Sequence, residues 1–99
     1  MNNSVHEKSW QSFLTLCQQH ESIDELDQML RFFLTPEELT ALAGRYRIIK
    51  SLLTGQEPQR KMAEDLQVSI AKITRGSNGL KHQSDEFKQR LKALMESHT

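Results

Sequence analysis

Cationic and short polar side chains occur together in one stretch of the chain, residues 59–80. Ser69 offers a hydroxyl that can cap the start of a helix, and Lys72, Thr74 and Arg75 follow within the next two turns. A helix of this composition carries cations that can reach phosphates and short polar groups that can reach base edges. The chemistry indicated is recognition of a nucleic acid.

Two short helices joined by a tight turn must position these side chains. Gln67 occupies the turn position that commonly requires positive φ, which costs a residue other than glycine about 1 kcal/mol. The small Ala63 lets the second helix cross the first closely, and Val68 adds an apolar residue to the turn. We therefore predict a helix-turn-helix over about 59–78, with an ordinary helical hairpin as the alternative interpretation. The apolar positions at helical spacing are Met62, Ala63 and Leu66 in the first helix and Ile70, Ile73 and Leu80 in the second.

Four further helices are expected around this unit, over about 6–19, 23–33, 36–54 and 85–95. Ser22, Thr35 and Ser84 are suited to cap the last three of them. Thr35-Pro36-Glu37-Glu38 combines an N-cap, a proline at the first helical position and a capping-box glutamate, and Gly55 is suited to end the helix that follows. Residues 1–5 and the link 81–83 are expected outside helices. The sequence thus predicts an all-α chain of about six helices and a single domain over 1–99.

The helix expected at 23–33 is apolar on more than one side, so it should be covered twice. The 99 residues of the chain are 36% hydrophobic, and a chain this short builds only a modest core by itself. A homodimer that shares its core would cover both sides of this helix. The residues concerned are Ile23, Leu26, Met29, Leu30, Phe32, Phe33 and Leu34.

The charges are divided unevenly along the chain although they cancel overall, with 13 basic and 13 acidic residues. Residues 1–44 hold two bases and seven acids, whereas residues 45–99 hold eleven bases and six acids. The second part can therefore present a basic face to phosphates without making the protein basic. Simple segregation of surface charges is the alternative.

The remaining reactive side chains do not form a catalytic or metal-binding pattern. His6, His20, His82 and His98 are scattered, without partners at metal-ligand spacing. Cys17, the single cysteine, lies in an apolar run and is interpreted as a small core residue in a reducing compartment. No signal peptide or long apolar segment is present. We expect a soluble cytoplasmic protein that is not an enzyme, holds no metal and has no membrane partner.

Several runs of residues resemble the bacterial tryptophan repressor family. The most specific run is Ile73-Thr74-Arg75-Gly76-Ser77-Asn78-x-Leu80-Lys81, and the similarity extends without a gap from about Leu34 to Lys81. The other matching runs are Leu34-Thr35-Pro36-Glu37-Glu38, Arg45-x-Arg47-Ile48-Ile49 and Gln59-Arg60. The resemblance implies an intertwined homodimer with two helix-turn-helix reading heads. It also implies repression of tryptophan biosynthesis genes through palindromic operator DNA, with L-tryptophan as corepressor.

The resemblance further implies which residues bind L-tryptophan. The indole ring would lie between the guanidinium groups of Arg45 and Arg75, each contact contributing about 0.5–2 kcal/mol. Arg75 and Thr35 would bind the carboxylate, and Gly76 would let the ligand lie close to the backbone. Backbone carbonyls of the partner chain, at positions matching Phe32 and Leu34, would receive the ammonium group.

Gly79 departs from the family, which often has a serine there that bonds the amino group of the ligand. Loss of that bond would cost about 1.5–3 kcal/mol if nothing replaces it. Three consequences are open: a lower affinity, a water in place of the hydroxyl, or better tolerance of an indole compound without the amino group. Without the family match, Arg45 could equally pair with Glu37 or Glu38, Arg75 could contact a phosphate, and Thr35 could be only a cap.

The resemblance also implies a set of DNA-contacting residues. Ala63 replaces a lysine and Lys72 replaces a threonine found in relatives, so a phosphate contact moves from the first helix to the second; a solvated surface lysine is the alternative. The strongest rival function is a regulator of the same superfamily that ignores tryptophan, and a weaker one is a helical protein-interaction module. The implied DNA-binding residues are Gln59, Arg60, Ile70, Ala71, Lys72, Thr74 and Lys81.

Overall fold

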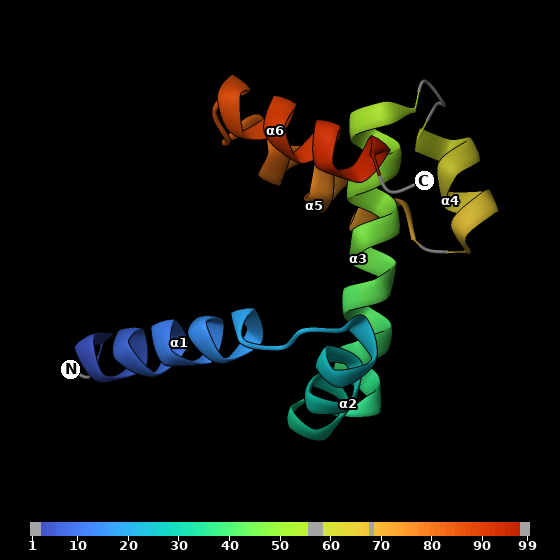
Figure 1. Ribbon diagram of the computed structural model, residues 1–99. Coiled ribbons are helices and arrows are strands. Elements are labelled where there is room, and N and C mark those ends of the chain that lie inside the picture. The colour runs from blue at the N-terminus through green and yellow to red at the C-terminus, as the bar shows by residue number, and fades with distance from the viewer. Residues whose placement is uncertain (1–2, 56–58, 68, 98–99) are drawn as a thin grey trace. The chain divides into compact units, whose positions relative to one another are not determined.

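A computed structural model describes residues 3–55, 59–67 and 69–97, and within these ranges the chain is entirely helical apart from turns. Figure 1 labels its six helices in chain order. The predicted all-α class is therefore confirmed. The expectations for Val68, for residues 1–2 and for the side chain of Leu66 lie outside the described part. The helices are α1 (Asn3–Gln18), α2 (Ile23–Phe33), α3 (Pro36–Thr54), α4 (Gln59–Leu66), α5 (Ile70–Lys81) and α6 (Asp85–Glu96).

The predicted N-caps are confirmed at the start of four helices. In α2, α5 and α6, the hydroxyl of Ser22, Ser69 or Ser84 accepts a hydrogen bond of 3.1 Å from the backbone N–H three residues later. At α3 the capping box is reciprocal. Thr35 Oγ1 accepts from the Glu38 N–H at 3.1 Å, and Glu38 Oε1 accepts from the Thr35 N–H at 2.8 Å. These bonds satisfy N–H groups that a helix start leaves without intrahelical partners.

Two helix boundaries differ from the predicted ones. Helix α1 begins at Asn3, so residues 3–5 are helical. The sequence did not predict this first turn because it carries no apolar periodicity. Helix α5 includes Lys81. Helix α3 ends at Thr54 as expected, but Gly55 does not take a left-handed conformation. Its N–H instead donates to the Ser51 carbonyl at 2.7 Å, and a Cβ there would lie 2.6 Å from that oxygen.

The chain divides into two compact units, Met1–Leu39 and Thr40–Thr99. In the first unit, α1 and α2 contact each other through the rings of Phe13 and Phe33, whose centroids are 5.3 Å apart. No described residue of this unit is buried, and Ile23 and Phe32 are each 83% exposed. The sequence predicts that other side chains cover α2 on two sides. The described residues of the single chain do not provide this cover. The thiol of Cys17 is free and half-buried.

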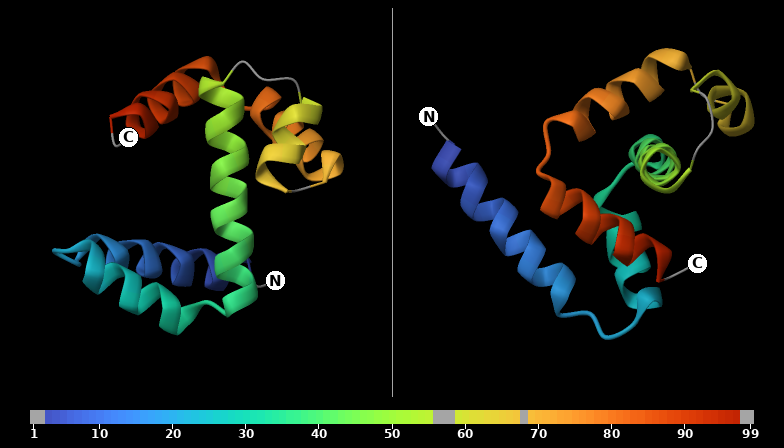
Figure 2. Two further views of the ribbon diagram at one scale, coloured as in Figure 1. Left: turned by 90° about the vertical axis from the view of Figure 1, so that its right-hand side faces the viewer. Right: turned by 90° about the horizontal axis from the view of Figure 1, so that it is seen from above.

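The second unit has a small core of its own. Ile48 of α3, Met62 of α4 and Ile73 of α5 are buried together, and Leu52 and Ala63 pack against them. Figure 2 shows α4 and α5 beside the C-terminal half of α3. This core fixes α5, and with it the side chains proposed for DNA and ligand binding. None of the helices in the described ranges has both the length and the apolar character needed to span a bilayer.

Candidate nucleic-acid interface and adjoining cavity

Helices α4 and α5 form a helix pair joined by a tight turn, as the helix-turn-helix prediction requires. Met62 and Ile73 are 1% and 0% exposed at the contact, and the small Ala63 is packed beside them. Gln67 in the turn has a φ of 56°, as predicted from its position. It is the one residue in the described ranges, glycines included, with a positive φ. The turn therefore keeps a left-handed residue even though glycine is missing there.

The side chains of helix α5 point in three different directions, because successive residues are about 100° apart around the helix axis. Ile73 faces the core with Gly76 close behind it. A Cβ on Gly76 would lie 3.1 Å from Ile48 Cγ2, so this glycine allows α5 to lie close to α3. A second face carries Ile70 and Thr74, and a third carries Lys72 and Gly79. One helix therefore serves the core, an exposed recognition surface and a cavity.

All seven predicted DNA-binding residues are exposed. Gln59 and Arg60 lie at the start of α4, and Lys81 is the last residue of α5. Ile70, Ala71 and Thr74 occupy the exposed face of the first half of α5, the part that enters the groove in a helix-turn-helix. Lys72 is exposed as well, but it belongs to the face that lines the cavity. Helix α5 contains three basic residues and no acidic one.

A cavity of about 910 Å³ lies within the Thr40–Thr99 unit, between α3, α5 and α6. It brings together four of the seven residues predicted to bind the ligand: Arg45 from α3 and Arg75, Gly76 and Gly79 from α5. Apolar side chains complete the walls. They are Ala41, Ala43, Ile48 and Ile49 from α3, Leu80 from α5, and Phe87 and Leu91 from α6.

The charges around this cavity all have one sign. Arg45, Arg47, Lys72 and Arg75 line it, and no carboxylate does so among the described residues. Glu38, one of the partners considered for Arg45, bonds to Thr35 instead. A hollow that combines apolar walls with clustered cations attracts an aromatic molecule bearing an anionic group.

The two cavity glycines have different surroundings. Gly76 is pressed against Ile48, whereas nothing lies within 4 Å of the position that a Cβ on Gly79 would occupy. Close packing against Ile48 thus explains why position 76 is a glycine, in addition to the expected approach of a ligand. It also leaves room for a side chain at position 79.

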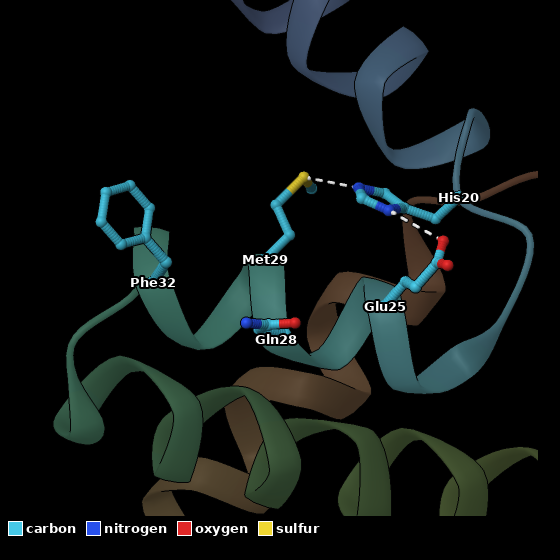
Figure 3. Close-up of a pocket in the computed structure, with 5 residues that line it drawn as sticks. All are labelled: His20, Glu25, Gln28, Met29 and Phe32. Atoms are coloured by element: carbon cyan, nitrogen blue, oxygen red, sulfur yellow. Dashed lines mark hydrogen bonds and ion pairs between the residues drawn. The ribbon is translucent and has the colours of Figure 1, made fainter.

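The other three predicted ligand-binding residues belong to the Met1–Leu39 unit. Thr35 caps α3, and the Leu34 N–H donates to the Leu30 carbonyl at 2.8 Å at the end of α2. Phe32 lines an open depression of about 390 Å³ (Figure 3). There His20 Nε2 lies 2.9 Å from Met29 Sδ, and His20 Nδ1 lies 3.8 Å from Glu25 Oε1. The depression also includes Gln28.

Sequence reasoning missed several residues of the cavity. Lys72 was assigned to DNA alone, yet Gly76 and Gly79 follow it by four and seven residues, which places all three on one helical face. That spacing was a usable signal. Phe87 and Leu91 lie in the last predicted helix, but the sequence does not say which neighbouring helix its apolar side chains contact. Within the described ranges, no three His, Cys, Asp or Glu side chains are grouped to hold a metal.

Comparison with known proteins identifies relatives over most of the chain. Residues 8–95 match the family described as Trp repressor protein. A Trp operon repressor homolog of Photobacterium profundum is 46% identical over 86 residues, which cover 87% of this chain and 84% of that protein. One of Chlamydia trachomatis serovar D is 46% identical over 85 residues, covering 86% and 90%. One of Vibrio vulnificus is 40% identical over 96 residues, covering 97% and 94%.

Proposed function

Because the chain belongs to the Trp repressor protein family, we propose that it is an L-tryptophan-dependent repressor that binds palindromic operator DNA as a homodimer. Membership makes it a regulator of the Trp repressor type, and the family is one of regulators, not of enzymes. The observation that carries the proposal is a single cavity lined by Arg45 and Arg75, directly beside the exposed face of α5.

DNA binding is supported by the shape and charge of the α4–α5 pair. The exposed face of α5 carries Ile70, Ala71 and Thr74, which are small or apolar enough to approach base edges in the major groove. Arg60 and Lys81 stand at opposite ends of the pair, where they can neutralise phosphates on either side of the groove. In this assignment, base contacts come from the first half of α5 and positioning comes from the flanking cations.

Tryptophan binding is supported by the chemistry of the cavity walls. The planar guanidinium groups of Arg45 and Arg75 can stack on both faces of an indole ring. Arg75 can at the same time bind the carboxylate. The apolar side chains of Ile49 and Leu80 suit the edge of the ring. The regulated genes in this proposal are those of tryptophan biosynthesis, as the relatives' names suggest.

A homodimer is supported by the exposed apolar side chains of the Met1–Leu39 unit. Ile23, Phe32 and Phe33 of α2 and Trp10 and Leu14 of α1 are all at least 47% exposed. Exposed apolar side chains gathered on a small protein mark an interface. In the proposed dimer, this unit packs against the second chain, and Thr35, Phe32 and Leu34 reach the partner's ligand.

The proposed mechanism is that of a wedge. The ligand fills the space between α3 and α5 and sets the tilt of α5 and the separation of the two reading heads, so that both match successive major grooves. Without the ligand, the heads are held at a spacing that DNA does not accept. The ligand therefore acts on DNA affinity by selecting one arrangement of α5.

The experiment is a gel-shift assay with duplexes selected from a random pool, with and without L-tryptophan. The proposal predicts enrichment of a palindromic sequence and a shift that requires L-tryptophan. A shift that is the same without L-tryptophan would support a second candidate, a regulator of this family that does not respond to tryptophan, which the missing side chain at Gly79 favours. No enrichment of any sequence would contradict both.

A further inference from the structure

His20, Glu25 and Met29 form a cluster that the proposed function does not use. His20 lies in the link between α1 and α2, and its ring lines the open depression of about 390 Å³ in the Met1–Leu39 unit. Figure 3 shows the ring in contact with Met29 through one nitrogen and with Glu25 through the other. Glu25 and Met29 are four residues apart, so α2 presents both on the same face.

The two nitrogens of the His20 ring have different neighbours. Nδ1 lies 3.8 Å from Glu25 Oε1, and the same oxygen accepts a hydrogen bond of 3.4 Å from the Glu21 N–H, which holds the carboxylate in place. A carboxylate beside Nδ1 favours the tautomer with the proton on that nitrogen, an arrangement that orients many metal-binding histidines. The lone pair of Nε2 then points at Met29 Sδ, 2.9 Å away.

Nε2 of His20 and Sδ of Met29 are therefore two electron-pair donors that face the same space. A thioether is only a weak hydrogen-bond acceptor, but it is a good ligand for a soft cation, and imidazole binds copper as well. A bridging ion needs bonds of about 2.0 Å to nitrogen and about 2.3 Å to sulfur, as in zinc sites. An outward swing of the thioether by about 1 Å opens that gap, and the three rotatable bonds of methionine allow it. The His20 side chain is 23% exposed, so an ion can reach it from solvent.

From this geometry we propose that His20 and Met29 form a binding site for a soft monovalent metal ion, Cu(I). Cu(I) accepts low coordination numbers and thioether ligands, whereas a structural zinc site needs four ligands. No group of three His, Cys, Asp or Glu side chains in the described ranges supplies such a zinc site. The spacing of the histidines indicated no metal in the sequence because the second ligand is a methionine. Neither operator DNA nor L-tryptophan takes part in this site.

The first test follows the methionine methyl groups by NMR while Cu(I) is added to the full chain without oxygen. The sequence has four methionines, so a methyl-labelled sample gives four signals, and Met29→Leu identifies the one that matters. We expect Cu(I) to shift the Met29 signal and to leave the other three in place, and Zn²⁺ to shift none. A Met29 signal that stays in place with Cu(I), or that moves equally with Zn²⁺, would overturn the proposal.

The second test measures Cu(I) affinity by competition with bicinchoninate, in a Cys17→Ser background. Cys17 has a free thiol, which is also a soft ligand, and its carbonyl accepts from the His20 N–H at 3.4 Å. Without the thiol, one Cu(I) per chain should still bind. No binding in this background would assign the metal to Cys17 and contradict the site described.

Two substitutions in that background remove one ligand each. Met29→Leu keeps the size and apolar character of the side chain, and His20→Gln keeps a polar one. Each should weaken Cu(I) binding at least about tenfold, because loss of even a group behind a metal ligand costs that much. His6→Gln in α1 and Met95→Leu in α6, both outside the depression, are the matched controls and should change nothing. Thermal unfolding checks that each variant is folded, and equal affinities in the ligand and control variants would refute the proposal.

Discussion

The two units of this chain differ in how far their apolar side chains are buried. In Met1–Leu39 no described residue is buried, and α2 exposes Ile23 and Phe32. In Thr40–Thr99, Ile48, Met62 and Ile73 are buried together in a core that joins three helices. The first unit is also acidic and the second basic, with two bases against seven acids in residues 1–39. This difference agrees with the proposed function, in which the second unit binds DNA and ligand and the first unit binds another chain.

The largest effect is expected from the core of the second unit. Ile73→Ala should lower the free energy of unfolding by about 2–5 kcal/mol, because Ile73 is fully buried between α3 and α4. Urea unfolding at a fixed protein concentration measures it. Ile70→Ala, one turn away and 46% exposed, should cost less than about 1 kcal/mol. Equal costs at the two sites would mean that Ile70 is also covered, which would contradict its assignment to the DNA-facing surface.

The next effect tests the first unit. Ile23→Glu places a charge on a side chain that is 83% exposed in the single chain, so a monomer should tolerate it. If a second chain covers this face, dimerisation should weaken by about 2–3 kcal/mol, which sedimentation equilibrium can measure. Gln28→Glu adds the same charge to α2 at a polar position and should change dimerisation much less. A dimer unaffected by Ile23→Glu would place the interface elsewhere.

A smaller effect on stability is expected from substitutions at two glycines of the second unit. Gly76→Ala brings a methyl group to 3.1 Å from Ile48 Cγ2, and this overpacking should offset the gain in helix propensity. Gly79→Ala meets open space and should stabilise the protein by about 0.5–1 kcal/mol. Thermal unfolding should therefore rank Gly79→Ala above Gly76→Ala. The reverse order would show that α5 does not lie against α3 as described.

The smallest effect concerns the turn between α4 and α5. Gln67→Gly should stabilise the protein by up to about 1 kcal/mol, because Gln67 is held at a φ of 56°. Gln67→Ala keeps a Cβ and should give no such gain. Urea unfolding distinguishes the two. If glycine brings no more stability than alanine, the left-handed conformation at this position carries no strain.

Local features of the fold could be predicted from the sequence because they depend on near neighbours. The caps at Ser22, Ser69 and Ser84, the Thr35–Glu38 capping box and the positive φ of Gln67 all follow from residues within one turn. The start of α1 did not follow, since a helical turn exposed on all sides has no apolar periodicity. Gly55 was correctly predicted to follow the end of α3. The structure gives a different reason for glycine there, which is the close approach of the Ser51 carbonyl.

The candidate site was predictable in part. The run from Ile73 to Lys81 was sufficient to select Arg75, Gly76 and Gly79, and the structure places them with Arg45 around one cavity. The spacing of Lys72 to Gly76 and Gly79 was a signal for its place on that cavity, whereas the contribution of Phe87 and Leu91 depends on how α3, α5 and α6 pack, which helical spacing does not determine. The predictions for Thr35, Phe32 and Leu34 assume ligand contacts from two chains, so a single chain does not test them.

The central claim is that a ligand in the cavity lined by Arg45 and Arg75 and DNA on the exposed face of α5 strengthen each other's binding. Isothermal titration of L-tryptophan into the protein, alone and saturated with the selected palindromic duplex, tests it most directly. Linkage requires the DNA to tighten L-tryptophan binding by the same factor by which L-tryptophan tightens DNA binding, about 5- to 150-fold for typical coupling. Identical L-tryptophan affinities with and without the duplex would contradict the account.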